Sequence, residues 1–525
     1  MARLWDLVVV QWCVVLALLV GLPWSMSGYL LTGRMVWVPR PEVRRADLWG
    51  AGETQLRALP SDALAALAGT AIDPMVVQRV VLWAALALAG LGAARLVRDL
   101  GVGPMLATAT LAVWNPYVAE LLVTGRWPEL VAYAGLPWIV VAVRHPTGVR
   151  WAVLTLALAA AALTPATGIV GLLLAVAAGA GRAGVFRPLV LATVLNAPWV
   201  VVAVLADRYP RTPDLDIGTE APGPVTALLV VVGVVGLVGA VRLVRTDLPL
   251  VRALGGAAVV GALIASVDAL AAGAVSDAVD VFGPAVLLQD AGMFLVLAVP
   301  FCLVAFGHGV GWLTRLVEER VVDHRWAVAP AVIAVALPLA ALPALFDGVD
   351  DRVEPVEYPA DWTAARVAVA ASPVDGDILV LPFSALREHE WNAGRTVVDP
   401  AGLFFDRVTL TPTTGVPAAD AVRALLEAGA PAAEFAAAGI GIVVLDPAAA
   451  PAVGGPEPVL LTGAREVPTG EVGLRVFELD GATPADRTED REVLWAAWGL
   501  AGAFVLVALL RVVGASFSRL RSARV

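Results

Sequence analysis

The stretch WNPYVAELLVTGRWPELVAYAGLPWIVV, residues 114–141, decides how the rest of the chain is interpreted. It lies between apolar runs, yet Asn115-Pro116 ends a helix, because a residue that precedes proline avoids the helical region. Charged Glu120 and Arg126 follow before the apolar sequence resumes. A segment of this kind is typical of a hairpin between two membrane helices, close to the membrane surface. We also expect its aromatic side chains to lie in the interfacial belt, namely Trp114, Tyr117 and Trp127.

The composition excludes a soluble globular protein. The 525 residues are 59% hydrophobic and have a mean hydropathy of +0.81, whereas a soluble domain is about 45–50% apolar. The formal net charge of −10 and the absence of lysine argue against a nucleic-acid partner. Cys13 and Cys302 both fall in predicted spans, so they form no secreted disulfide framework.

We predict an α-helical polytopic membrane protein with about twelve transmembrane helices. The N-terminal apolar run resembles a signal peptide, but its length and the many later spans favour an uncleaved first helix. Arginine-rich connections predict that both termini are cytoplasmic. The predicted spans are 6–24, 76–97, 103–121, 129–144, 150–164, 167–182, 187–206, 223–243, 251–271, 286–309, 326–346 and 491–512.

Two predicted external segments are longer than ordinary loops. The first, 25–75, belongs to a multi-span membrane domain that covers residues 1–346. The second, 347–490, alternates helical patterns such as PADWTAARVAVAA with buried-strand patterns such as DILVLPF, GIVVLD and LRVFEL. This alternation predicts a small extracytoplasmic α/β domain. Residues 491–525 then form the last transmembrane helix and a basic cytoplasmic tail.

The chain carries no motif of a soluble enzyme. GxxxxGK[ST], GxGxxG after a strand, HExxH and CxxC pairs are all missing from the sequence. The four histidines show no spacing that is typical of metal ligands, so the sequence names no metal-binding residue. Any site must therefore be built from charged residues near the membrane.

The first external loop holds the main candidates. It carries five basic and five acidic residues between Arg34 and Asp73. Guanidinium groups suit lipid phosphates, because they bond two phosphate oxygens at once, and a nearby carboxylate can act as a general base. A solvated loop with weak salt bridges explains the same residues. We name Asp47, Glu53 and Asp62 as candidate catalytic acids, and Arg40, Arg57 and Arg126 as candidate phosphate ligands.

A late span, GPAVLLQDAGMFLVLAVPF, carries Gln289 and Asp290 near its external end. An ionisable residue at such a position is costly and indicates a function, although it also fits an interfacial position. We therefore treat Asp290 as a supporting residue of the site, together with Glu120 of the hairpin.

These features together resemble the GT-C superfamily of polyprenyl-phosphate-sugar glycosyltransferases. The resemblance rests on the charged first loop, the late aspartate and the hairpin pattern formed by Asn115, Pro116, Tyr117, Glu120, Gly125 and Trp127. The external motifs YPADW (358–362), LVLPF (379–383), EWNAGR (390–395) and VVDP (397–400) are similar to those of the extracytoplasmic domain in the same group. The likeness is to actinobacterial membrane proteins related to AftD-type arabinofuranosyltransferases and YfhO-type proteins.

The resemblance implies a polyprenyl-phosphate sugar donor at the outer leaflet and a cell-envelope glycan acceptor. A first-loop acid would deprotonate the acceptor, the sugar would invert, and polyprenyl phosphate would leave. The leaving phosphate needs cationic stabilisation from arginine or a divalent metal; the sequence names no certain cofactor.

Three departures from the superfamily pattern keep other functions open. Arg34 stands where an acid is expected, Met293 where a basic residue is expected, and Leu121 where an arginine is expected. A catalytically degenerate relative that binds lipid or glycan, or acts as a scaffold, fits these departures. A transporter or flippase is a third possibility, although no clear internal repeat is visible.

Overall fold

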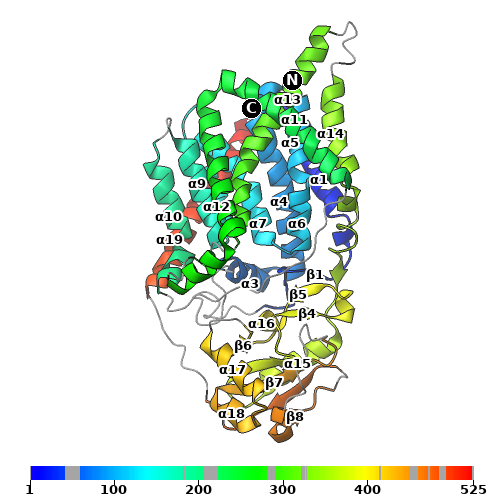
Figure 1. The fold of residues 1–525 in the computed structure, drawn as a ribbon, viewed down its shortest axis with the longest axis vertical. Coiled ribbons are helices and arrows are strands. Elements are labelled where there is room, and N and C mark those ends of the chain that lie inside the picture. The colour runs from blue at the N-terminus through cyan, green and yellow to red at the C-terminus, as the bar shows by residue number, and fades with distance from the viewer. Residues whose placement is uncertain are drawn as a thin grey trace.

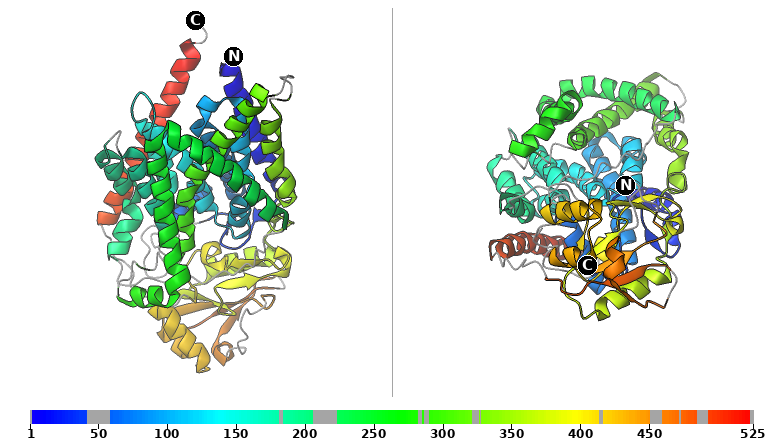
Figure 2. Two further views of the ribbon diagram at one scale, coloured as in Figure 1. Left: turned by 45° about the horizontal axis from the view of Figure 1, so that its top comes forward. Right: turned by 60° about the horizontal axis from the view of Figure 1, so that its bottom comes forward.

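The protein consists of a helical bundle with an α/β domain at one end (Figure 1). The computed structural model describes residues 2–41, 59–180, 184–205, 223–281, 285, 290–320, 326, 328–412, 416–449, 459–470, 473–483 and 492–522. Helix α1 begins, and helix α19 ends, at the end of the bundle that lies away from the α/β domain (Figures 1 and 2).

The bundle is that of a multi-pass membrane protein. Within the described residues, seven helical segments are long and apolar enough to cross a membrane, and five shorter apolar helices accompany them. The count of twelve spans remains a prediction. The bundle contains α1 (Ala2–Val20), α4 (Pro74–Leu96), α5 (Val102–Val113), α6 (Pro116–Val123), α7 (Trp127–Val143), α8 (Trp151–Ala161), α9 (Pro165–Gly179), α10 (Phe186–Leu205), α11 (Gly223–Thr246), α12 (Leu248–Val281), η5 (Ala291–Ala298), α13 (Val299–Arg320), α14 (Ala329–Ala341) and α19 (Glu492–Ser522).

The hairpin of residues 114–141 forms the centre of this bundle. The apolar window of Val102–Val123 is 72% buried, compared with 17% for the peripheral span Leu228–Thr246. Asn115 ends α5 and caps α6, because its side-chain oxygen accepts the Val118 N–H at 3.0 Å. Pro116 then takes the first helical position, where no N–H is needed.

Trp114 is enclosed by protein and does not face the lipid. Its side chain is fully buried, and its indole N–H donates to the Leu342 carbonyl oxygen at 2.8 Å. Trp127 is also buried, where it contacts Trp37 of the first loop with a ring separation of 5.5 Å. Both rings therefore lie in the protein interior, because Leu342 contacts Trp114 and Trp37 contacts Trp127.

The α/β domain is built on a five-stranded sheet with the order β6-β3-β7-β9-β8. Strand β3 is parallel to β6 and β7, whereas β9 is antiparallel to both β7 and β8. Separate apolar clusters pack around this sheet, one with Trp362 and Phe404 and the other with Phe435. The elements are β2 (Pro355–Val356), α15 (Ala360–Ala371), β3 (Asp377–Leu381), β4 (Leu386–Glu388), β5 (Thr396–Val398), α16 (Ala401–Phe404), β6 (Thr409–Leu410), α17 (Pro417–Glu427), α18 (Ala432–Ala437), β7 (Ile440–Leu445), β8 (Arg465–Val467) and β9 (Arg475–Glu478).

The first loop joins the bundle to the α/β domain. Its strand β1 (Tyr29–Leu30) pairs antiparallel with β2 of the domain, and its helix α3 (Ser61–Ala71) packs on α4. The domain is therefore held to the bundle by backbone hydrogen bonds, and it does not hang from a single linker.

Candidate functional site

Two arginines and one aspartate, far apart in the sequence, converge at the end of the bundle that faces the α/β domain. Arg34 Nη1 lies 3.3 Å from Asp290 Oδ2, and Arg126 Nη1 lies 3.1 Å from the same oxygen. A second nitrogen of Arg126, Nη2, lies 3.3 Å from Asp290 Oδ1. Arg34, Arg126 and Asp290 form what we call the arginine–aspartate cluster.

The backbone around two glycines positions both arginines. Gly33 and Gly125 have φ of +51° and +67°, a region that L-residues other than glycine seldom adopt. The Arg34 N–H donates to the Thr124 carbonyl at 2.9 Å, and the Thr32 hydroxyl donates to the Val123 carbonyl at 2.7 Å. A β-carbon on Gly125 would lie 2.0 Å from the Thr32 oxygen, so only glycine allows this approach.

The α/β domain secures the same segment from the other side. The Gly33 N–H donates to the Thr396 carbonyl at 3.0 Å, and the Val398 N–H donates back to the Gly33 carbonyl at 2.8 Å. The segment around Gly33 thus lies between the hairpin and β5 and is hydrogen-bonded to both. The cluster consequently lies where the bundle, the first loop and the α/β domain meet.

The charges in the cluster support one another. Burial raises the pKa of the Asp290 carboxyl, but Arg126 and Arg34 outweigh burial and hold that pKa below its usual range. Burial lowers the pKa of the Arg126 guanidinium, and the attraction of Asp290 and Glu129 more than restores it. Glu129, a buried carboxylate in the first turn of α7, therefore balances the second arginine charge.

The cluster keeps unused hydrogen-bonding capacity. The Nε atoms of Arg34 and Arg126 are buried, and neither finds an acceptor among the residues that the structure describes. The Asp290 side chain is 43% exposed, compared with 11% for Arg34 and 18% for Arg126. An anion that reaches this surface would find two guanidinium groups held in place, and guanidinium is the cation that matches a phosphate best.

The predicted site residues divide into three groups. Arg126 and Asp290 are brought together as ion-pair partners. Asp47, Glu53 and Arg57 lie outside the described residues, as does Gln289. The structure places Asp62, Arg40 and Glu120 on other elements.

Those three residues have different surroundings. Asp62 lies in the first turn of α3. The Arg40 side chain is exposed, and it is the Arg40 carbonyl oxygen that is used, as an acceptor of Arg366 Nη2 at 2.6 Å. The Glu120 side chain is exposed in the middle of α6. Arg40 is therefore held as part of the contact between the first loop and α15.

Sequence analysis missed Arg34 and Glu129 as members of the site. In the superfamily pattern Arg34 stands where an acid is expected, whereas in the structure it is a partner of Asp290, 256 residues away. Glu129 was visible in the hairpin, one turn after Arg126. Its position in the first turn of a helix that begins at a charged residue was the available signal.

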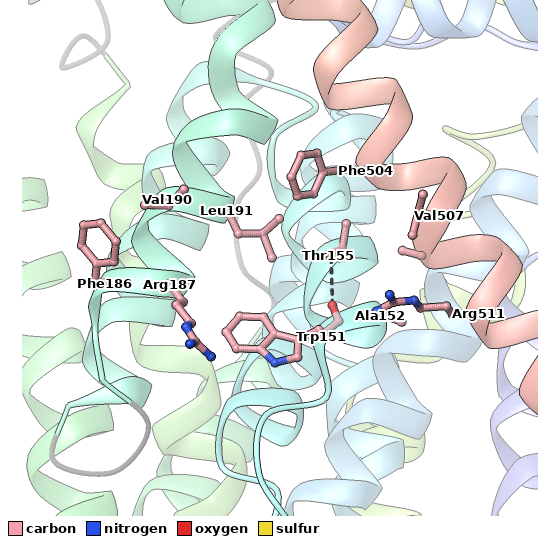
Figure 3. A pocket seen from close by; sticks show the side chains of 11 residues that line it. Trp151, Ala152, Thr155, Phe186, Arg187, Val190, Leu191, Phe504, Val507 and Arg511 are labelled. Atoms are coloured by element: carbon pink, nitrogen blue, oxygen red, sulfur yellow. Dashed lines mark hydrogen bonds between the residues drawn. The ribbon is translucent and has the colours of Figure 1, made fainter.

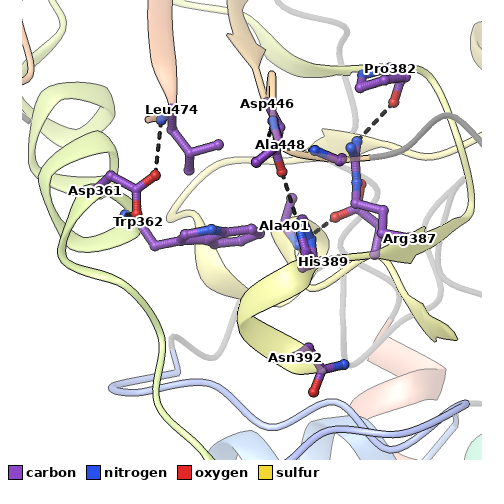
Figure 4. Close-up of polar contacts among 12 residues, drawn as sticks. Asp361, Trp362, Pro382, Arg387, His389, Asn392, Ala401, Asp446, Ala448 and Leu474 are labelled. Carbon is purple, nitrogen blue, oxygen red and sulfur yellow. Dashed lines mark hydrogen bonds and ion pairs between the residues drawn. The ribbon is translucent and has the colours of Figure 1, made fainter. Parts of the chain in front are cut away.

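A second charged cluster lies inside the α/β domain and is closed (Figure 4). Arg387 Nε lies 2.7 Å from Asp399 Oδ2, and His389 Nδ1 lies 3.5 Å from Asp446 Oδ2, with all four side chains at most 5% exposed. Burial is the main cause that lowers the pKa of His389, and burial also raises the pKa of Asp446. This Arg387–Asp446 cluster joins β4 and β5 to the end of β7, so its evident role is to hold the domain together.

A metal site is not evident in the described part of the chain. No group of three or more His, Cys, Asp or Glu side chains among the described residues could hold a metal ion.

The sequence matches no protein-family model and no curated protein. The fold, however, is similar to that of the arabinofuranosyltransferase AftD from mycobacteria. The two structures superpose with a TM-score of 0.61 at 17% sequence identity, over 93% of this chain and 40% of AftD. The likeness to AftD-type arabinofuranosyltransferases inferred from the sequence is thereby confirmed at the level of fold. This chain spans only about 40% of the length of AftD.

An oligosaccharyltransferase from Archaeoglobus fulgidus is a more distant match. It has a TM-score of 0.38 and 12% identity, and the match covers 83% of this chain and 68% of that one. This likeness is too weak to support an argument about the site.

Proposed function

We propose that the protein is a membrane glycosyltransferase that uses a polyprenyl-phosphate sugar as donor and a cell-envelope glycan as acceptor. The observation that carries this proposal is the convergence of Arg34 and Arg126 on Asp290, at the end of the helical bundle that faces the α/β domain. The fold that holds them is similar to that of an arabinofuranosyltransferase. In this arrangement the two guanidinium groups bind the donor phosphate, and the polyprenyl chain extends into the surrounding lipid.

Transfer requires one bond to form as another breaks. The acceptor hydroxyl oxygen bonds to the anomeric carbon while the bond from that carbon to the phosphate oxygen breaks, with inversion. The phosphate oxygen keeps the electron pair, and Arg34 and Arg126 stabilise the charge that develops there. The hydroxyl proton passes to a carboxylate, for which Asp47, Glu53 and Asp62 of the first loop are the candidates.

Asp290 has a positioning role in this scheme. It holds both arginines through its two oxygens, and its lowered pKa keeps it ionised at neutral pH. A carboxylate of low pKa is a weak base, so Asp290 serves better as an anchor than as the proton acceptor.

The proposed orientation places the cluster at the outer leaflet and both termini in the cytoplasm. Arginines gather at the bundle end away from the α/β domain, where Arg144 and Arg98 lie, and loops rich in arginine stay in the cytoplasm. The α/β domain is then extracytoplasmic, on the side where an envelope glycan is available.

The test is a transfer assay on the full chain in lipid nanodiscs. Polyprenyl-phosphate sugars serve as donors, and envelope glycan fragments serve as acceptors. Arg34→Gln and Arg126→Gln are each expected to lower kcat/KM by about 10²–10³-fold, the usual effect of removing one group that stabilises developing charge. Arg423→Gln, an exposed arginine of α17 that pairs with Asp420, is the matched control and keeps the full rate.

The same assay tests which residue acts as the general base and whether transfer requires a metal ion. Asp47→Asn, Glu53→Gln and Asp62→Asn are compared at equal protein levels in the membrane, and full activity of all three would rule out a first-loop base. Loss of transfer on adding a chelator, with recovery on adding a divalent cation, would assign part of the phosphate charge to a metal.

A binding protein without turnover is the second candidate. It is favoured by the Asp290 carboxylate, which is already ion-paired through both oxygens. Such a protein binds polyprenyl phosphate in calorimetry and loses that binding in Arg126→Gln, yet it transfers no sugar from any donor. Measurable turnover in the wild-type chain rejects it.

A further inference from the structure

A groove of about 390 Å³ lies between α8, α10 and α19 (Figure 3). It is at the bundle end away from the α/β domain, since α10 begins there and α19 ends there. It is therefore separate from the arginine–aspartate cluster, and nothing in the proposed function uses it.

The walls of the groove are apolar and exposed. Phe186 of α10 has 74% of its surface exposed, and Phe504 and Val507 of α19 have 41% and 50%. In a multi-pass membrane protein, such side chains face hydrocarbon instead of water. The body of the groove thus suits an acyl chain.

The mouth of the groove is cationic. Arg187 and Arg511 lie on opposite sides of Trp151 (Figure 3). Among the described residues, neither arginine has an ion-pair or hydrogen-bond partner. Other arginines at this bundle end do have carboxylate partners: Arg98 lies 2.7 Å from Asp6, and Arg144 lies 3.5 Å from Asp247.

We propose that this groove binds one anionic phospholipid from the leaflet at this end of the bundle. The two guanidinium groups bind the headgroup phosphate, and Trp151 lies at the level of the glycerol, where indole rings are favoured. An acyl chain lies along Phe504 and Val507. The lipid ties α19, which follows the α/β domain in the chain, to α8 and α10.

Two features select an anionic phospholipid of this leaflet over the proposed donor. Two unpaired positive charges attract a headgroup with net negative charge more strongly than a zwitterionic one. The donor phosphate, in contrast, is expected at the opposite end of the helices, beside Arg34 and Arg126.

The experiment is native mass spectrometry of the full chain with phosphatidylglycerol or phosphatidylcholine added to the delipidated protein. The wild type is expected to retain one phosphatidylglycerol and to discriminate against phosphatidylcholine. Arg187→Gln with Arg511→Gln should weaken phosphatidylglycerol binding by about 25-fold, since each basic residue near an anionic lipid contributes about fivefold. The matched control, Arg245→Gln with Arg320→Gln, removes two exposed arginines at the same bundle end and keeps the affinity.

A second variant keeps the charges and fills the groove. Val507→Trp should abolish the retained phosphatidylglycerol while Arg187 and Arg511 remain. Unchanged binding in either groove variant overturns the proposal. So does equal binding of phosphatidylcholine by the wild type, or displacement of phosphatidylglycerol by polyprenyl phosphate at equal concentration.

Discussion

The two charged clusters of this protein use the same residue types for opposite purposes. In the Arg387–Asp446 cluster, both carboxylates accept backbone N–H groups: Asp399 from Ala401 at 3.0 Å, and Asp446 from Ala448 at 3.1 Å. Both clusters hold buried nitrogen atoms that find no hydrogen-bond acceptor among the described residues, on Arg34 and Arg126 in one and on Arg387 and His389 in the other. The difference is exposure: the Asp290 side chain is 43% exposed, whereas the four side chains of the Arg387–Asp446 cluster are at most 5% exposed. A charged network enclosed on every side is out of reach of a ligand and stabilises the fold, whereas one whose carboxylate is exposed at a surface can be reached by a ligand.

Removing one arginine from each cluster should separate the two purposes, and it gives the largest expected effect. Arg387→Leu leaves Asp399 buried without its partner, which costs about 3–5 kcal/mol. Arg126→Leu leaves Asp290 43% exposed to water and still paired with Arg34, so the cost should be smaller than that of Arg387→Leu. Hydrogen exchange of the β3 and β7 amides in the full chain measures the first cost, and thermal unfolding of the full chain measures the second.

Arg423→Leu is the control for this comparison. It removes an exposed arginine of the same domain, and the expected change lies within about 0.5 kcal/mol. If Arg387→Leu leaves β3 and β7 as protected as the control does, the closed cluster is not what holds the domain together.

The glycine turn of the hairpin offers a second, smaller test. Gly125→Ala places a residue with a side chain at φ +67°, which costs about 1–2 kcal/mol, and it also pushes the new β-carbon onto the Thr32 carbonyl. Arg126 then shifts relative to Arg34, and a displacement of about 1 Å at a reacting group can lower a rate about 10²-fold. Thermal unfolding measures the loss of stability in Gly125→Ala, and the transfer assay measures the loss of rate.

Gly184→Ala is the matched control for that shift. Gly184 has a similar φ of +72°, but no atom lies within 4 Å of its would-be β-carbon. The control should share the conformational cost and keep the full transfer rate. A rate loss of the same size in both variants would show that the close approach of the hairpin and the first loop does not position Arg126.

Local pattern predicted most elements of the fold but only part of the site. The stretches PADWTAARVAVAA, DILVLPF and GIVVLD gave α15, β3 and β7, because burial and periodicity are written into consecutive residues. The short strands β1, β4 and β8 do not follow from the local pattern, since each has only two or three residues. Strands β4 and β8 pair with the nearby strands β5 and β9, whereas β1 pairs with β2, which lies far along the chain. Arg34 was misjudged for the same reason: its partner Asp290 is fixed by the fold and by no local pattern.

Two glutamates of the hairpin give the smallest expected effect and test which acid supports the open cluster. Glu129 is buried in the first turn of α7, where a carboxylate favours the helix N-terminus and attracts both arginines. Glu129→Gln should therefore lower stability by about 1 kcal/mol in thermal unfolding. Glu120 is exposed in the middle of α6, so Glu120→Gln should change stability by less than about 0.5 kcal/mol. A larger loss for Glu120→Gln than for Glu129→Gln would show that Glu129 is not the acid that supports the cluster.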